Sequence, residues 1–483
     1  MTHGNPFRTL FFIVATLIAA VVLMSFAPAV HVAHADEVAP QATISADVLN
    51  VRGGPGTAYP VVSQAKAGQT YPVSGKSADG KWFVIDLKGK QGWVLGQYVK
   101  ASGTLDGVAV VKAPAVPKAA AKAAAAPRSS PPGFFGYGVQ ISPGGDRGAA
   151  IGAVKGLGFN WVKVQLPWRE FENAGPGARN WPDDVVGDLN GNGLQILASI
   201  VKAPNWARNP AYNYAEEGPP ADPNTYASFV GEFARRYCGR VQAIEVWNEQ
   251  NINGEWGNEP PDPARYMQLL KAAYGAIKNN CRDMIVVSGA LTPAGNVTID
   301  GQWRALDDQA YLKAMYRYGL ARYSDAIGVH PSGYNVSPDV GWQQACAFIS
   351  EQGSQFRGAC DSPHPSWSFR STMEGYHNIM VANGDGRKRL WPTEFGWAAG
   401  GALHPAYKYA DDNTLDEQAA WTVRALQMMR NWGFVGPAFL WNLNYRMTDP
   451  GTERAQWGIL DANGGALPAY NALKDARNNG TLP

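Results

Sequence analysis

The chain has few charged residues, and the two signs nearly cancel. Charged side chains make up 17% of the 483 residues, and 42 basic against 40 acidic residues leave a formal net charge of +2. This balance provides no electrostatic attraction for nucleic acid or for an acidic membrane surface, so neither is an expected partner. Ligand recognition should instead depend on shape, hydrogen bonds and aromatic side chains, which include 17 Trp and 20 Tyr.

Several motifs that mark common kinds of catalytic site are also missing. The four cysteines do not have the spacing of a zinc site. The glycine-rich run Gly144–Gly148 lacks the spacing of a phosphate-binding loop, and no motif for a serine or cysteine nucleophile occurs. We therefore expect a chain that needs no cofactor and no metal.

Long apolar runs are confined to residues 1–35, which we interpret as an export signal. Arg8 precedes the apolar run Leu10–Phe26, and Ala33-His34-Ala35 has the small-x-small pattern of a cleavage site. The run is slightly long for a cleaved signal and slightly short for a membrane helix, so an uncleaved N-terminal anchor is the alternative and the only expected membrane contact. The chain should be secreted or associated with the cell envelope.

Export to an oxidising compartment favours disulfides over free thiols for the four cysteines. Proximity in sequence favours a bond between Cys346 and Cys360 across one loop, which leaves Cys238 to pair with Cys281. The alternative is that all four are buried free thiols.

The remaining chain divides into three parts by composition. Residues 41–101 contain short alternating runs separated by turn residues, which predicts a small all-β module. Residues 102–133 are dominated by Ala, Pro and Lys and lack large apolar residues, which predicts a linker. Residues 134–483 alternate apolar strand-like runs with amphipathic helical stretches.

This last part has the element count of a (β/α)8 TIM barrel. Two helix starts are clear, one at Asp222-Pro223 and one at the capping-box pair Thr414 and Glu417. The expected strands are 134–141, 161–166, 194–200, 241–247, 284–288, 326–330, 389–393 and 438–441. Functional side chains of such barrels lie at the C-terminal ends of the strands.

Two peptides place a glutamate directly after an expected strand. They are Ile244–Asn251, which reads Ile-Glu-Val-Trp-Asn-Glu-Gln-Asn, and Leu390–Trp397, which reads Leu-Trp-Pro-Thr-Glu-Phe-Gly-Trp. Glu249 follows the fourth strand and Glu394 the seventh. Two facing carboxyl groups, one protonating the leaving oxygen and one attacking the anomeric carbon, are what glycoside hydrolysis requires.

Two parts of the chain resemble known families. The run Leu49–Thr57 (Leu-Asn-Val-Arg-Gly-Gly-Pro-Gly-Thr), followed later by Gly92-Trp93-Val94, resembles the bacterial SH3-like domains of exported enzymes. That resemblance implies a cell-wall or envelope ligand; a spacer without a ligand is the alternative. Residues 134–475 resemble the clan A retaining glycoside hydrolases, with family 39 and family 5 nearest.

The clan A resemblance implies roles for individual residues. Glu249 is the implied general acid/base, Glu394 the nucleophile, and Asn248 a donor to the sugar hydroxyl beside the anomeric carbon. His330 and Tyr334 resemble the groups that contact the nucleophile and maintain its charge. One departure is Gln250, which stands where the family usually has proline.

Aromatic residues on the expected loops suggest an extended sugar-binding cleft, because sugar rings stack on such side chains. The clan A resemblance implies that Trp441, at the end of the eighth strand, is the platform under the sugar at the cleavage point, with core packing as the alternative. Trp206, Trp256 and Trp397 are further candidates for substrate binding. The alternative for each of these three is a loop anchor that packs onto the barrel. Lys163 is a weaker candidate for binding sugar hydroxyls.

The resulting hypothesis is an exported retaining O-glycosidase acting on a β-linked polysaccharide or oligosaccharide. We expect the two carboxyl groups to lie about 5 to 5.5 Å apart, and the pKa of Glu249 to be raised. A transglycosidase, a hydrolase of an amino-sugar cell-wall polymer, and a non-catalytic carbohydrate-binding barrel are the alternatives.

Overall fold

The computed structural model describes residues 40–114 and 135–483, apart from residues 47, 57, 58, 60, 104, 106, 213 and 216. The predicted export signal and most of the predicted linker lie outside these residues. In the described part of the chain, no helix combines the length and apolar character needed to cross a membrane. The all-β unit and the larger C-terminal unit are compact separately and are described one at a time.

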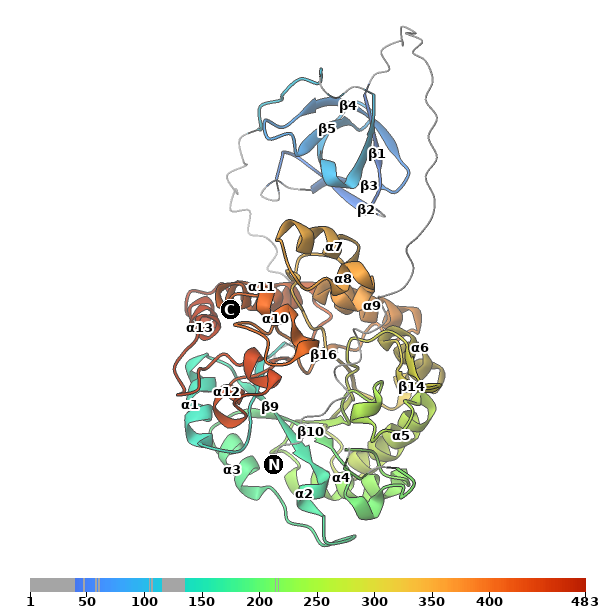
Figure 1. Cartoon of the computed structure of the whole chain (residues 1–483), viewed down its shortest axis with the longest axis vertical. Coiled ribbons are helices and arrows are strands. Elements are labelled where there is room, and N and C mark those ends of the chain that lie inside the picture. Colours follow the sequence, from blue (N-terminus) through green and yellow to red (C-terminus); the bar gives the residue numbers. More distant parts are fainter. Residues whose placement is uncertain are drawn as a thin grey trace. The chain divides into compact units, whose positions relative to one another are not determined.

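The N-terminal unit is an antiparallel β-structure with the strand order β3-β2-β6-β5-β4-β1-β7. Short alternating segments form it because every second side chain enters a small core that includes Ala42, Val51 and Val94. The strands, shown in blue in Figure 1, are β1 (Gln41–Ile44), β2 (Val48–Arg52), β3 (Val61–Lys66), β4 (Thr70–Lys76), β5 (Trp82–Asp86), β6 (Gln91–Leu95) and β7 (Val99–Ser102).

The chain stays on this unit beyond the predicted boundary at residue 101. Val110 forms an isolated bridge with Lys76, and the Val111 amide donates to the Lys76 carbonyl at 2.8 Å. The Tyr59 hydroxyl donates to the Pro114 carbonyl at 2.7 Å. Residues up to 114 are therefore part of the module's packing rather than of a free linker.

The C-terminal unit has the predicted eight-stranded parallel sheet, in the order β16-β15-β12-β11-β10-β9-β8-β17. Each expected strand overlaps an observed one, and β9 and β10 each extend one residue beyond the expected end. Isolated bridges such as Phe395 to Leu440 connect the two edge strands into a barrel. The strands are β8 (Tyr137–Gln140), β9 (Trp161–Pro167), β10 (Gln195–Val201), β11 (Ala243–Val246), β12 (Ile285–Ser288), β15 (Ala326–Val329), β16 (Leu390–Pro392) and β17 (Ala438–Leu440).

Helices surround the barrel, as Figure 1 shows. Both predicted helix starts are confirmed: the Asp222 side chain caps α4, and Thr414 and Glu417 form a capping box at α11. The helices are α1 (Arg147–Gly156), α2 (Trp168–Phe171), α3 (Asp183–Gly191), α4 (Pro223–Tyr237), α5 (Pro263–Asn280), α6 (Asp308–Arg317), α7 (Trp342–Glu351), α8 (Gly358–Asp361), α9 (Phe369–Ala382), α10 (Tyr409–Asp412), α11 (Leu415–Trp432), α12 (Tyr445–Thr448) and α13 (Pro468–Asn478).

Side chains fill the barrel rather than leaving a pore. Trp161 packs edge-to-face against Trp391 and Phe439, in one cluster with small and branched strand residues. This cluster occupies the part of the interior near the strand starts. The polar groups described below occupy the opposite, C-terminal part.

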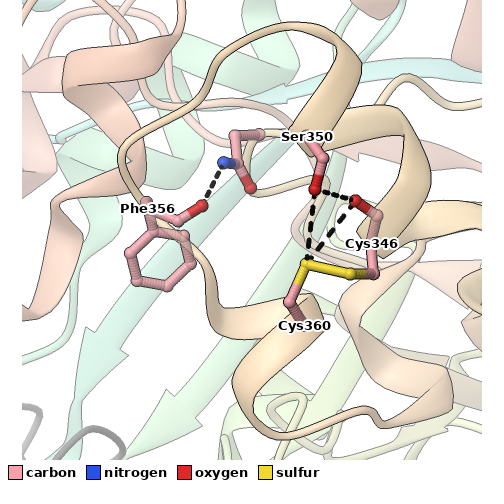
Figure 2. The surroundings of a disulfide bond; sticks show 5 residues. Cys346, Ser350, Phe356 and Cys360 are labelled. Atoms are coloured by element: carbon pink, nitrogen blue, oxygen red, sulfur yellow. Dashed lines mark hydrogen bonds between the residues drawn. A yellow bond between two sulfur atoms is a disulfide. The ribbon is translucent and has the colours of Figure 1, made fainter.

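Both predicted disulfides are present: Cys238 pairs with Cys281, and Cys346 with Cys360. The second joins α7 to α8, and Figure 2 shows the Ser350 hydroxyl donating to the Cys346 carbonyl beside it at 2.8 Å. These helices belong to a second hydrophobic cluster, separate from the main core, that also contains Trp367, Trp441 and Trp457. The disulfide therefore braces a cluster that reaches the C-terminal end of the barrel.

An additional hairpin, which the sequence did not reveal, follows β12. It consists of β13 (Val297–Ile299) and β14 (Gln302–Ala305), paired antiparallel. Ala305 also bridges to Ile252 in the loop after β11. The hairpin is thereby attached to the loop that carries Glu249.

Candidate active site

The two predicted glutamates converge at the C-terminal end of the barrel. Glu249 follows β11 and Glu394 follows β16, and both are buried, with 5% and 9% of their surface exposed. An oxygen of Glu249, an oxygen of Glu394 and a ring nitrogen of His330 all lie within 4.8 Å of one another. The strand ends therefore bring together three titratable groups that are far apart in sequence.

The loop that presents Glu249 has a constrained backbone. Trp247 and Glu249 have φ angles of 74° and 47°, in the left-handed region that costs energy for residues other than glycine. The Glu249 amide donates to the Ala290 carbonyl at 2.8 Å, and the Gln250 side chain donates to the Gly289 carbonyl at 2.7 Å. Gln250, the departure from the family pattern, thus ties this loop to the end of β12.

Glu394 is held by a lysine on β9 and a glutamine side-chain amide on β8, two strands that pair with each other. Lys163 Nζ donates to Glu394 Oε1 at 2.9 Å, and the Gln140 amide, oriented to donate, reaches the same oxygen at 3.1 Å. Burial alone would lower the pKa of the fully buried Lys163, but the charges of Glu245 and Glu394 outweigh it and raise that pKa. Lys163 is therefore a cation that neutralises carboxylates, not the sugar-hydroxyl binder that the sequence suggested.

His330 contacts the other glutamate. Its Nδ1 atom lies 3.0 Å from Glu249 Oε1 and 3.9 Å from Glu394 Oε2, and its Nε2 atom lies 3.1 Å from the Thr393 hydroxyl. His330 thus approaches both glutamates, and the shorter contacts of Glu394 are those with Lys163 and Gln140. The expected role of His330 and Tyr334 at Glu394 stays a prediction.

Tyr334 lines the same cavity from the loop after β15. Burial raises the pKa of its hydroxyl, so the group stays protonated at neutral pH. Its ring packs edge-to-face on Trp367 and Tyr409, with centroids 4.5 and 5.2 Å away. Tyr334 therefore forms part of an aromatic wall.

A third carboxylate, Glu245 on β11, is fully buried and was not singled out from the sequence. Its Oε1 atom accepts from the Thr393 hydroxyl at 2.7 Å, and its Oε2 atom lies 3.2 Å from Lys163 Nζ. Lys163 therefore lies between two carboxylates, Glu245 and Glu394. A charged residue that interrupts the apolar run of a buried strand is the signal that points to such a group.

A cavity of about 120 Å³ lies beside the two glutamates. Glu249, Glu394, His330, Tyr334 and Trp441 all line it, so the structure brings five predicted site residues to one place. One group of further lining residues comes from the β11 loop and the β13–β14 hairpin and includes Asn253, Glu255 and Arg304. Another is aromatic and comprises Trp367, Tyr407, Tyr409 and Trp457.

Three predicted substrate-binding tryptophans lie elsewhere. Trp256 and Trp397 are 0% and 1% exposed. Trp397 donates to the Val336 carbonyl, and Trp256 packs against Trp247. Their assignment to a sugar-binding surface is wrong, because their loops fold back and place the rings in the core. Trp206 is half-buried, donates to the Glu172 carbonyl at 2.7 Å and does not line the cavity.

Asn248, the predicted donor to a sugar hydroxyl, is buried beside the site. It is 4% exposed, and among the described residues its Oδ1 atom has no hydrogen-bond partner. It does not line the cavity in the present conformation. An unpaired buried amide oxygen is costly, so this side chain is a candidate for a ligand contact that the structure does not contain.

Trp367 and Arg304 also line the cavity and were missed at the sequence level. Trp367 comes from the segment before α9, and Arg304 from the unpredicted hairpin. Neither follows a barrel strand directly, so strand-end reasoning does not reach them.

Within the described residues, two groups of side chains have atoms close enough to share a metal ion: Glu249, His330 and Glu394, and the cluster of Asp307, Asp308 and His364. In the first group the Lys163 ammonium already contacts Glu394 at 2.9 Å, where it would repel a metal cation. In the second, His364 Nε2 is hydrogen-bonded to Asp307 at 2.8 Å. Neither arrangement favours a metal over the interactions already present.

The C-terminal unit shares its fold with glycoside hydrolases. A family 39 glycoside hydrolase from Bacteroides cellulosilyticus WH2 superposes with a TM-score of 0.54 at 18% identity, over 91% of this chain and 77% of that one. A glucosidase from Croceicoccus marinus gives 0.50 at 14% identity, over 70% of this chain and 66% of that one. At these identities the likeness establishes the (β/α)8 fold.

Residues 47–100 match the bacterial SH3 domain family. A stretch of 56 residues is 41% identical to a putative N-acetylmuramoyl-L-alanine amidase, YrvJ, of Bacillus subtilis strain 168. The match covers 11% of this chain and 10% of that relative's length. The N-terminal module is thus a bacterial SH3 domain, and the likeness to the amidase is limited to 56 residues.

Proposed function

We propose that the C-terminal unit is a retaining glycosidase that cleaves a β-linked polysaccharide or oligosaccharide with Glu394 as nucleophile and Glu249 as general acid/base. The observation that carries the proposal is the approach of the two carboxyl groups, with oxygens within 4.8 Å, in a cavity at the C-terminal end of the barrel. Direct attack with retention uses carboxyl groups about 5 to 5.5 Å apart, whereas inversion needs roughly 6.5 to 9.5 Å to admit a water.

The contacts of Glu394 fit the role of nucleophile. Lys163 and Gln140 both bind Oε1, so Oε2 is the atom left for the anomeric carbon. Glu249 then gives its proton to the leaving oxygen, and in the second step it takes a proton from the water that releases the sugar.

The cavity wall supports a sugar as the ligand. Trp441 lines the cavity, and its indole N–H donates to the Gln140 amide oxygen at 3.3 Å, which fixes the ring. Trp457 lies beside it, with ring centroids 5.2 Å apart. Fixed aromatic faces beside polar groups suit the apolar C–H faces and the hydroxyls of a pyranose ring.

Matched glutamate variants test the assignment. Glu394→Gln and Glu249→Gln should each lower kcat on aryl β-glycosides at least about 100-fold, because each removes one proton-transfer or nucleophilic group. Glu374→Gln, at a surface ion pair with Arg370 on α9, should match the wild type. NMR of the first-formed sugar should show the retained anomer. An inverted product, or a wild type inactive on a broad glycoside panel, contradicts the proposal; the inactive wild type would favour a binding barrel.

A second candidate is a transglycosidase or hydrolase of an amino-sugar cell-wall polymer. Two observations favour it: the SH3 domain at residues 47–100, and the 56-residue likeness to a putative N-acetylmuramoyl-L-alanine amidase. We propose that this domain binds a cell-wall or envelope ligand and that the enzyme works outside the cytoplasm. Sedimentation of the full chain with purified cell walls, compared with a chain lacking residues 41–114, tests the domain. Equal binding by both chains contradicts its role.

A further inference from the structure

Both glutamates of the candidate site are connected through Glu245, which lies on β11 and is fully buried. On one side Glu245 pairs with Lys163, which contacts Glu394. On the other it accepts from Thr393, which contacts His330, which in turn contacts Glu249. The contacts of Glu245 reach residues on or directly after β9 and β16, across the barrel interior.

The Thr393 hydroxyl sets the direction of the hydrogen bonds. An ionised carboxylate only accepts, so at 2.7 Å the single hydroxyl proton of Thr393 points to Glu245 Oε1. The oxygen of Thr393 therefore presents only lone pairs to His330 Nε2, 3.1 Å away. His330 must carry a proton on Nε2 to make this contact favourable.

The proton on Nε2 determines what Nδ1 can do. In a neutral imidazole protonated at Nε2, Nδ1 is an acceptor. It lies 3.0 Å from Glu249 Oε1, and two acceptors at that distance repel unless a proton lies between them. The Glu249–His330 pair therefore holds one proton between Nδ1 and Oε1, as a carboxylic acid beside imidazole or as a carboxylate beside imidazolium.

We propose that Glu245 is a positioning residue that acts through Thr393 to fix the tautomer of His330 and so keeps a proton on the Glu249–His330 pair. The inference rests on the proposed function of Glu249 as general acid. Glu245, which is buried on its strand and does not line the cavity, would thus control whether the general acid Glu249 has the proton that it donates.

The proton balance of the reaction is closed. When the glycosidic bond breaks, the pair's proton moves to the leaving oxygen, which leaves Glu249 as a carboxylate beside neutral His330. The water that attacks the glycosyl–Glu394 bond gives its proton to Glu249, and the starting state returns. Thr393 and Glu245 keep their own protonation throughout.

Thr393→Val and Thr393→Ser form the matched pair that tests the inference. Valine keeps the shape of threonine but removes the hydroxyl, whereas serine keeps the hydroxyl. The first readout is ¹⁵N NMR of the full chain labelled at histidine, with His330 assigned by its absence in His330→Asn. We expect Nε2 to be protonated in the wild type and in Thr393→Ser. In Thr393→Val it should be unprotonated, with the proton moved to Nδ1, where it can donate to Glu249.

The second readout is kcat/KM, which reports the step in which the acid is used. In Thr393→Val, kcat/KM should fall about 10- to 100-fold for glycosides with a poor leaving group, such as a second sugar. It should fall less than about threefold for dinitrophenyl glycosides, whose departure needs no protonation. Because an Nδ1–H donor favours ionised Glu249, the basic limb of the pH profile should move to lower pH by about one unit or more.

The possible outcomes separate the two proposals. Equal loss on both substrate classes, or identical behaviour of the valine and serine variants, overturns the positioning role, since a merely structural defect would act in that way. A wild-type His330 with unprotonated Nε2 also overturns it. A wild type with protonated Nε2 but no glycosidase activity overturns the proposed function instead.

Discussion

Replacing Lys163 with methionine tests the charge balance of the site most directly. Lys163 Nζ is 2.9 Å from Glu394 Oε1 and 3.2 Å from Glu245 Oε2, and its side chain is fully buried. At an effective dielectric constant near 20, each contact corresponds to about 5 to 6 kcal/mol of Coulomb attraction. Desolvation of the ammonium and the carboxylates offsets much of this. Removing one partner of a buried ion pair typically costs about 3 to 5 kcal/mol.

We therefore expect Lys163→Met to lower the free energy of unfolding by about 3 to 5 kcal/mol at pH 7. Lys202→Met is the control, because Lys202 follows the neighbouring strand β10 and pairs with Glu217 at a partly exposed site. That change should cost about 1 kcal/mol or less. Urea denaturation followed by tryptophan fluorescence compares the two.

The double variant Lys163→Met/Glu245→Gln makes the test specific. Glu245→Gln removes the carboxylate that Lys163→Met leaves buried without its cation. The double variant should be about 2 kcal/mol more stable than the sum of the single effects predicts. Strict additivity, or a Lys163→Met variant as stable as Lys202→Met, would refute the ion-pair account.

The pH dependence of this contribution has a definite sign. The pKa of Lys163 is raised in the folded chain because Glu245 and Glu394 outweigh the effect of burial. A raised pKa means that the contribution is fully present below the unfolded-state pKa of about 10.4 and is lost as the pH rises through the folded value. The difference between the wild type and Lys163→Met should therefore persist at neutral pH and shrink under strongly alkaline conditions.

Three further changes have expected outcomes. Replacing both Cys346 and Cys360 with serine should lower stability by up to about 3 kcal/mol in calorimetry, given the 14-residue separation; no change in Tm would show that the loop is held by its packing alone. Burial raises the pKa of Asp308 to about 6, so stability should fall as the pH rises from about 4 through 6. Asp308→Asn should flatten that slope in urea denaturation, and an unchanged slope would contradict the shift. Trp441→Ala should raise KM about tenfold or more on oligosaccharides, and an unchanged KM would remove the ring from the sugar site.

The barrel was predictable because buried parallel strands read as apolar runs. Each of the eight expected segments overlaps one observed strand, with ends that agree to within three residues. Strand ends then placed Glu249, Glu394, His330 and Trp441 on one face without any knowledge of their side-chain contacts. The hairpin β13–β14 was not predicted, because its strands have three and four residues and lie outside the barrel.

Side-chain direction was the part that the sequence could not provide. Trp397 follows Glu394 by only three residues, yet its ring points into the core, with its indole N–H donating to Val336 at 2.8 Å. Gly333 passes so close to that ring that a Cβ atom there would lie 1.8 Å from it. A loop that reverses within a few residues sends one aromatic ring to the cavity and the next into the core, and composition does not distinguish the two.

The charges inside the barrel agree with the cationic transition state of the proposed reaction. Glu245 and Glu394 contribute two negative charges and Lys163 one positive charge, while the Glu249–His330 pair with its single proton is neutral under the tautomer proposed above. These groups together sum to one net negative charge; Glu255 and Arg304, which also line the cavity, have opposite signs and leave the sum unchanged. Glycoside cleavage passes through an oxocarbenium-like state, in which positive charge develops on the sugar ring. A fixed negative charge at that place is stabilising only if its residues cannot relax or take up protons before the substrate binds. The buried Lys163 and Glu245, which the cavity does not expose, provide that fixation.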